Sequence, residues 1–184
     1  LLAGMLAAAQ FGCAGGPQPS YPANTRDRLA SYDKATPCCD DPSGFRYVAL
    51  PEQGFADASI DRTSPVFDFH SGLSPFVAYE LPKSAGPYRV RVKSFFAPGV
   101  DSPVFYPVIA VPDDTFIVTQ LTGLDSLRVE PALATAGGET GLTVTLPVEP
   151  GDGGKYLIVF TPAALLGKAP DTRREGDLLT PSSL

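Results

Sequence analysis

The chain has 184 residues, enough for one domain of ordinary size, and 43% of them are hydrophobic, enough to bury a core. Its 20 prolines and 18 glycines interrupt helices too often for a helical bundle, a coiled coil or a doubly wound nucleotide-binding fold. The formal net charge of −6 disfavours binding to phosphates, so we expect no nucleic-acid partner.

The N-terminal residues 1–12 are apolar, carry no charge and lead directly to Cys13. As a helix they would span about 18 Å, too short to cross a hydrocarbon core of roughly 30 Å. They match the apolar region of a secretory signal, and a cysteine directly after a small residue indicates a lipoprotein cleavage site with Cys13 acylated. An ordinary signal peptide cut nearby is the alternative, and both interpretations predict an exported protein. The Pro- and Gly-rich residues 14–35 are typical of a tether.

Cys38 and Cys39 are adjacent in a segment rich in turn residues. Because free thiols rarely persist in an oxidising compartment, we expect a vicinal disulfide between them that clamps a loop near the entrance to the domain. Its ring would be strained, since neighbouring Cα atoms lie only about 3.8 Å apart. Metal ligation and a redox-active pair are weaker alternatives, because a chain with three Cys and one His falls short of a closed zinc shell.

From residue 45 onward the chain shows nine short strand-like segments at intervals near ten residues, the spacing of a β-sandwich. In the clearest one, Tyr88, Val90 and Val92 are expected to face the core, while the intervening cations Arg89, Arg91 and Lys93 face solvent. Pro107 favours an edge or a bulge in a segment that is otherwise apolar on both faces. The nine segments are 45–50, 65–69, 76–81, 88–93, 104–111, 115–119, 126–130, 142–146 and 155–160.

One short helix is predicted near residues 162–167. Thr161 is the expected N-cap, Pro162 the first helical residue and Gly167 the stop signal. The fold class that follows is all-β: a single antiparallel, jelly-roll-like β-sandwich over residues 36–184, preceded by the leader 1–13 and the tether 14–35.

The sequence contains no glycine-rich phosphate loop and no nucleophile elbow. His70 beside Ser71 is typical of a turn rather than of a catalytic triad. The acidic pairs Asp40/Asp41 and Asp113/Asp114 lie beside proline, which favours solvated turns, with a weak Ca²⁺ site as the alternative. We therefore expect no enzymatic activity, no cofactor and no metal site.

Two sets of residues are candidates for binding. Tyr79, Tyr88 and Tyr106 have rings on which a ligand such as a sugar can stack, although core packing competes with that role. The cation row Arg89, Arg91 and Lys93, with Lys83 nearby, either meets an anionic partner or is the solvated face of a sheet.

The order of several segments resembles the maltose operon periplasmic protein family. Cys38-Cys39 precedes 45–50, and 60–69 and 72–82 then follow; 156–161 with its short helix is similar to a second block of that family. The tail 170–179 is similar to the family's closing strand. The chain departs from the pattern at Arg173-Arg174, where a His is common, and at 180–184, where the strand does not continue as alternating apolar residues.

This resemblance implies a non-enzymatic envelope protein that assists maltose or maltodextrin uptake by binding the sugar or a transport component. It would be periplasmic, or anchored to the outer membrane through a lipid on Cys13. The alternative is a structural accessory lipoprotein subunit of an outer-membrane or envelope assembly, acting as a protein-binding module. The expected partners are thus an oligosaccharide or an envelope protein, and the membrane if Cys13 is acylated. The family has no established catalytic residues to carry over.

The lipid on Cys13 is directly testable. Mass spectrometry of the protein extracted from membranes should find diacylglycerol on Cys13, and Cys13→Ser should release the protein into the soluble fraction. An unmodified Cys13 in a soluble, correctly exported protein would rule out the anchor.

Overall fold

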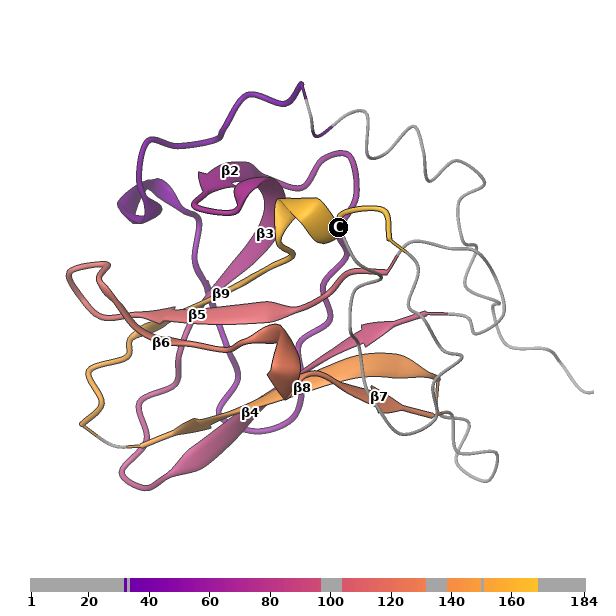
Figure 1. Cartoon of the computed structure of the whole chain (residues 1–184). Helices are drawn as coiled ribbons and strands as arrows, with labels where there is room; N and C mark the ends of the chain where they lie inside the picture. The colour runs from indigo at the N-terminus through magenta and orange to yellow at the C-terminus, as the bar shows by residue number, and fades with distance from the viewer. Residues whose placement is uncertain (1–31, 33, 97–103, 132–138, 150, 169–184) are drawn as a thin grey trace, which may run out of the picture.

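The computed structural model describes residues 32, 34–96, 104–131, 139–149 and 151–168. In these ranges the chain forms nine strands and three short 3-10 turns (Figure 1). None of the helical segments described is long and apolar enough to span a bilayer. The leader with Cys13, most of the tether and the tail 169–184 lie outside the described residues, so the expected domain boundaries stay a prediction.

The strands form two sheets, which lie as an upper and a lower layer in Figure 1. The larger sheet has the order β1-β3-β9-β5-β6, with β2 paired to β3, and the smaller antiparallel sheet has the order β4-β8-β7. The predicted all-β sandwich is confirmed. The bounds are β1 Val48–Ala49, β2 Val66–Phe69, β3 Gly72–Glu80, β4 Tyr88–Phe95, β5 Val108–Pro112, β6 Val118–Leu121, β7 Arg128–Glu130, β8 Gly141–Val148 and β9 Tyr156–Phe160.

One strand pair departs from the antiparallel arrangement that the sequence predicts. β1 runs parallel to β3, with Val48 opposite Tyr79 and Ala49 opposite Glu80. A tight hairpin cannot join parallel strands, so the chain crosses over between them. On the way it forms β2, which pairs antiparallel with the first half of β3.

The main core lies between the two sheets. Alternate residues of β8 face inward, and they meet alternate residues of β5 and β9 from the larger sheet. These side chains are almost completely buried. The cluster includes Ile109, Val111, Leu142, Val144, Leu146, Val148, Leu157 and Val159, together with Leu81, Phe96, Val104, Tyr106 and Leu127.

A second apolar cluster covers the outer face of the larger sheet. Every residue of β5 is buried, and so are four of the five residues of β9. The side chains of β5 and β9 that point away from the main core pack under aromatic rings of β2 and of the segment that precedes β1. Phe69 stacks on Phe160 with ring centroids 4.1 Å apart, and Phe45 lies 4.2 Å from Phe76. The prediction that the apolar segment 104–111 is covered on both faces is therefore confirmed.

The predicted register of β4 is confirmed, but the burial differs for the two valines and for Lys93, whose side chain faces outward yet is only 21% exposed. Tyr88, Val90 and Val92 pack against the main core, whereas Arg89 and Arg91 are exposed. The two valines are half-buried rather than buried, because β4 is an edge strand of the smaller sheet.

Pro107 lies directly before β5 and Pro112 is its last residue. At these positions the β-ladder does not require the backbone N–H that proline lacks. β5 begins after Pro107, so the edge or bulge expected at that residue is wrong. The register shift of this region lies instead between Val111 and Pro112, where β5 pairs with β6.

The predicted helix is a single 3-10 turn, Ala163–Leu165. Thr161 does not cap it, because its fully buried hydroxyl donates to the Tyr106 carbonyl at 3.1 Å. Gly167 ends the turn with φ of 80°, a conformation that glycine adopts without strain. The other two turns are Pro42–Gly44 and Leu124–Ser126.

The burial difference within the smaller sheet generates a paired prediction. Val144→Ala removes a side chain that is 1% exposed and should lower the free energy of unfolding by about 2–3 kcal/mol, whereas Val90→Ala should cost about 1 kcal/mol. Urea unfolding followed by far-UV circular dichroism suits this chain, which has no Trp. A larger loss for Val90→Ala than for Val144→Ala would contradict this assignment of the inner face.

Candidate functional site

The candidate site lies where two neighbouring strands end together. Because β1 and β3 are parallel, the residues that follow each of them emerge at the same end of the sheet. The N–H of Leu50 donates to the Glu80 carbonyl and extends this pairing by one bond. Glu52 and Gln53 are thereby held beside the segment that follows β3, and Gly54, with φ of 95°, turns the chain directly after them.

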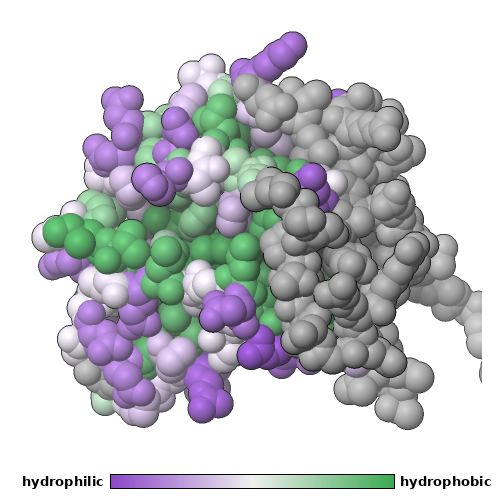
Figure 2. Space-filling view, in the orientation of Figure 1, coloured by the Kyte–Doolittle hydropathy of each residue, from purple (hydrophilic) through white to green (hydrophobic). Residues whose placement is uncertain are grey.

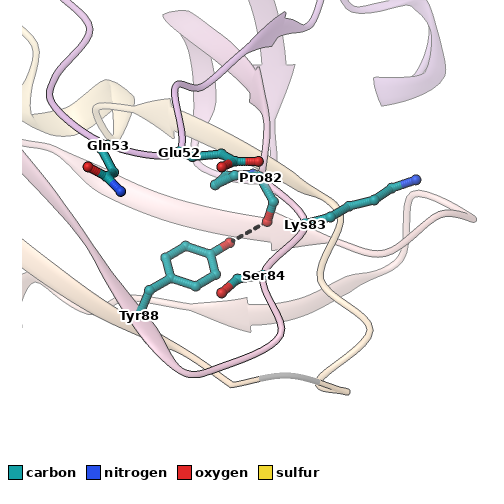
Figure 3. A pocket seen from close by; sticks show the side chains of 6 residues that line it. All are labelled: Glu52, Gln53, Pro82, Lys83, Ser84 and Tyr88. Atoms are coloured by element: carbon teal, nitrogen blue, oxygen red, sulfur yellow. Dashed lines mark hydrogen bonds between the residues drawn. The ribbon is translucent and has the colours of Figure 1, made fainter.

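The chain then reverses between β3 and β4. The Ser84 hydroxyl donates to the Gly86 carbonyl at 2.8 Å and accepts from the Gly86 N–H at 3.3 Å, which forms a compact turn. This turn places Tyr88 beneath Pro82, and the Tyr88 hydroxyl donates to the Pro82 carbonyl at 3.3 Å (Figure 3).

The result is a shallow hollow with about 470 Å³ of empty space, part of it open solvent. Figure 3 shows the Tyr88 ring and the Ser84 side chain on one side, Glu52 and Gln53 on the other, and Lys83 extending away. Burial raises the pKa of Tyr88, and its neutral phenol donates the hydrogen bond to Pro82. The lining is thus one aromatic ring surrounded by amide, carboxylate and hydroxyl groups: Glu52, Gln53, Pro82, Lys83, Ser84 and Tyr88.

The structure does not bring the three candidate tyrosines together. Tyr88 lines the hollow, with part of its surface packed on the main core. Tyr79 is half-buried against the same core but does not line the hollow. Tyr106 is only 6% exposed, so its ring belongs to the core and we do not retain it as a binding residue. Burial raises the pKa of both Tyr79 and Tyr106.

The cysteine pair lies at the start of the outer aromatic cluster. In the structure Cys38 and Cys39 are free thiols, so the vicinal disulfide stays a prediction. The Cys38 N–H donates to the Val66 carbonyl at 2.8 Å, and the Cys39 thiol donates to the Gly44 carbonyl at 3.2 Å. Partial burial and the neighbouring Cys39 raise the pKa of Cys38 to about 12, which disfavours a reactive thiolate.

One carboxylate of each acidic pair, Asp41 and Asp113, accepts hydrogen bonds within its own turn. One carboxylate oxygen of Asp113 accepts from the Thr115 hydroxyl and from the N–H groups of Thr115 and Ile117. The Thr115 hydroxyl, followed by the Ile117 and Thr115 amides, lowers the pKa of Asp113. Asp41 accepts from the Ser43 N–H at 2.7 Å and caps the first 3-10 turn. Within the described ranges no three His, Cys, Asp or Glu side chains gather as metal ligands, and His70 is exposed in the turn between β2 and β3.

Sequence reasoning missed an aromatic group at the tip of the β5–β6 hairpin. Phe116 stacks on Tyr156 with centroids 5.0 Å apart, and Tyr47 lies 4.2 Å from Tyr156. Phe116 has φ of 63°, an uncommon backbone conformation for a bulky residue, held by the hydrogen bonds of Asp113. Because these rings direct their faces at one another, they offer a ligand less surface than their number suggests. Figure 2 shows the same hairpin as a hydrophobic projection.

Comparison with known proteins identifies the family. A family model described as "Maltose operon periplasmic protein precursor (MalM)" matches residues 71–171, more than half of the chain. The chain belongs to the MalM family. This description links it to the maltose operon and to the periplasm and names no reaction. Searches of curated proteins and of solved structures give no match.

The MalM match covers one wall of the hollow. It runs from the β2–β3 turn past the last 3-10 turn and so includes Lys83, Ser84 and Tyr88. Glu52 and Gln53 precede it, as do Cys38-Cys39 and the segments 45–50 and 60–69 that contributed to the sequence resemblance. The blocks 72–82 and 156–161 lie within the match, whereas nearly all of the tail 170–179 lies beyond it.

We predict that Cys38→Ser/Cys39→Ser lowers the melting temperature by only a few degrees. A disulfide between neighbouring residues restricts the unfolded chain far less than a disulfide that closes a 15-residue loop, which stabilises a fold by about 3 kcal/mol. The hydrogen bond from the Cys38 N–H to the Val66 carbonyl does not involve sulfur, so the double variant keeps it. Non-reducing peptide mapping of the native protein should show one Cys38–Cys39 bond and no interchain dimer. Two free thiols, or collapse of the double variant, would count against the clamp.

Proposed function

We propose that this MalM-family protein is a non-enzymatic envelope protein that assists maltose and maltodextrin uptake by binding the oligosaccharide beside Tyr88. The observation that carries the proposal is the lining of the hollow. A sugar ring has apolar C–H faces and a rim of hydroxyls, so it suits an aromatic surface bordered by groups that donate and accept hydrogen bonds. Attachment to the outer membrane through acylated Cys13 is part of this proposal.

Each side chain of the hollow has a distinct role in the proposal. Tyr88 offers its ring for stacking while its hydroxyl is held by the Pro82 carbonyl. The exposed Glu52 and Gln53 have planar groups that accept from, or donate to, adjacent sugar hydroxyls. The small volume and the open side favour one or two sugar units of a longer chain, with modest affinity.

Calorimetric titration with maltose, maltotriose and longer maltodextrins tests the proposal. We expect saturable binding that Tyr88→Leu weakens about tenfold, or roughly 1.4 kcal/mol, because the apolar volume is kept while the aromatic face is lost. Tyr88→Phe should bind nearly as well as the native protein, and Glu52→Gln should bind more weakly.

Glu139→Gln provides the matched control for Glu52→Gln, since it removes one carboxylate from another exposed position. It should leave binding unchanged. No saturable binding of any maltodextrin would contradict the function. Binding that is insensitive to both Tyr88→Leu and Glu52→Gln would contradict the location.

A second candidate function is that of a structural accessory subunit of an envelope assembly. It is favoured by β6, an edge strand of the larger sheet with an unusually apolar exposed surface. Ile117, directly before β6, is 65% exposed, and Leu121, the last residue of β6, is 64% exposed; a strand edge of this kind can pair with a strand of a partner. Stable co-purification of an envelope protein, lost on Ile117→Lys, together with absent sugar binding would favour this function.

A further inference from the structure

The outer face of the smaller sheet concentrates positive charge in an acidic protein. The side chains of β4, β8 and β7 that point away from the main core share this face, as the register shows. Lys93 lies opposite Thr143, which in turn lies opposite Arg128, so cations from β4 and β7 are neighbours across β8. We call this set the basic face: Arg89, Arg91, Lys93, Phe95, Arg128, Glu130, Thr143 and Thr145.

Most of the basic face is open to solvent. Arg89, Phe95 and Arg128 are exposed, and the Arg91 side chain is 53% exposed. Figure 2 shows hydrophilic side chains over the lower part of the molecule, where this sheet lies, and also at the upper left. An extended, gently twisted array of this kind suits a broad surface better than a small ligand, which needs a concave site.

One carboxylate, that of Glu130, contacts two of the four cations. Glu130 forms an ion pair with Arg91, lies 3.6 Å from Lys93 and accepts from the Thr143 hydroxyl at 2.9 Å. The Arg91 hydrogen bond, followed by that of Thr143, lowers the pKa of Glu130 to about 2, so it stays ionised at neutral pH. Four cations against one carboxylate leave this face at +3, in a chain whose net charge is −6.

An exposed aromatic residue stands at one end of the row of cations. Phe95 is 51% exposed, and the Lys93 ammonium lies 5.3 Å from its ring centroid. Cations beside an exposed aromatic ring form the combination by which peripheral proteins bind anionic bilayers, where charge attracts and the ring enters the headgroup region. The acidic residues nearest in sequence to β8, Glu139 and Glu149, lie outside that strand.

We propose that the basic face is a docking surface for an anionic phospholipid bilayer. It orients the domain with the smaller sheet toward the lipid and the larger sheet, with its apolar hairpin, away from it. Each cation near an anionic surface contributes about a fivefold gain in binding, so a net +3 gives an affinity ratio on the order of 100 over a neutral bilayer. Binding of this strength is reversible and weakens with salt.

Vesicle co-sedimentation tests the proposal, with vesicles of phosphatidylcholine alone and vesicles that also contain phosphatidylglycerol. The probe protein is the full chain with Cys13→Ser, so that an acyl chain cannot account for binding. We expect binding to the phosphatidylglycerol vesicles alone, and its loss at about 1 M salt, where the Debye length is about 3 Å. Arg89→Gln/Arg91→Gln should weaken it roughly 25-fold.

The matched control is Arg46→Gln/Arg62→Gln, which changes the net charge equally at two exposed positions outside the smaller sheet. It should bind like the parent chain. Glu130→Gln raises the face to +4 and should strengthen binding about fivefold, so a second variant tests the idea even if the double variant folds poorly. Equal binding to both vesicle types, no binding to either, or equal losses in the basic-face and control variants would overturn the proposal.

Discussion

The burial of β5 and β9 on both faces is the constraint on which the rest of this structure depends. A strand with Ile158 and Phe160 on one side and Leu157 and Val159 on the other needs two covers. The smaller sheet provides one, and the aromatic side chains of β2 and of the segment before β1 provide the other. Three layers therefore pack together, and side chains of β2 and of the segment before β1 complete the covering of the central strands.

Much of this architecture follows from local pattern. Alternation fixes the inner face of β4, and the uninterrupted apolar segment that becomes β5 indicates its two-sided burial. What pattern cannot supply is the pairing of distant segments. The pairing of β1 with β3 depends on how the chain before β2 packs on the outer face of the larger sheet. The Thr161 hydroxyl bonds to the Tyr106 carbonyl rather than capping a helix, because the fold brings these two distant residues together.

The candidate site likewise combines a residue that the sequence identifies with residues that only the fold brings together. Tyr88 is identifiable from the sequence because it begins the clearest alternating segment, and its ring reaches the hollow. Glu52 and Gln53 are not identifiable from the sequence, since their place beside Ser84 results from the parallel pairing of β1 with β3. Tyr106 has the same side chain as Tyr88 but enters the core, because its segment leads into a central strand rather than an edge strand. The left-handed backbone of Phe116 depends on Asp113, three residues earlier, and no composition rule identifies it.

The position of β9 in the chain has a consequence for biogenesis. It lies between β3 and β5 in the larger sheet, yet it is the last of the nine described strands to be synthesised. Its pairing with β3, in which Phe160 lies opposite Phe76, closes a long loop. Such non-local pairing folds slowly. Until the chain through residue 160 is available, β3 and β5 lack their common neighbour and the larger sheet cannot assemble. A chain whose central strand is made last completes its larger sheet only after most of the polypeptide is available.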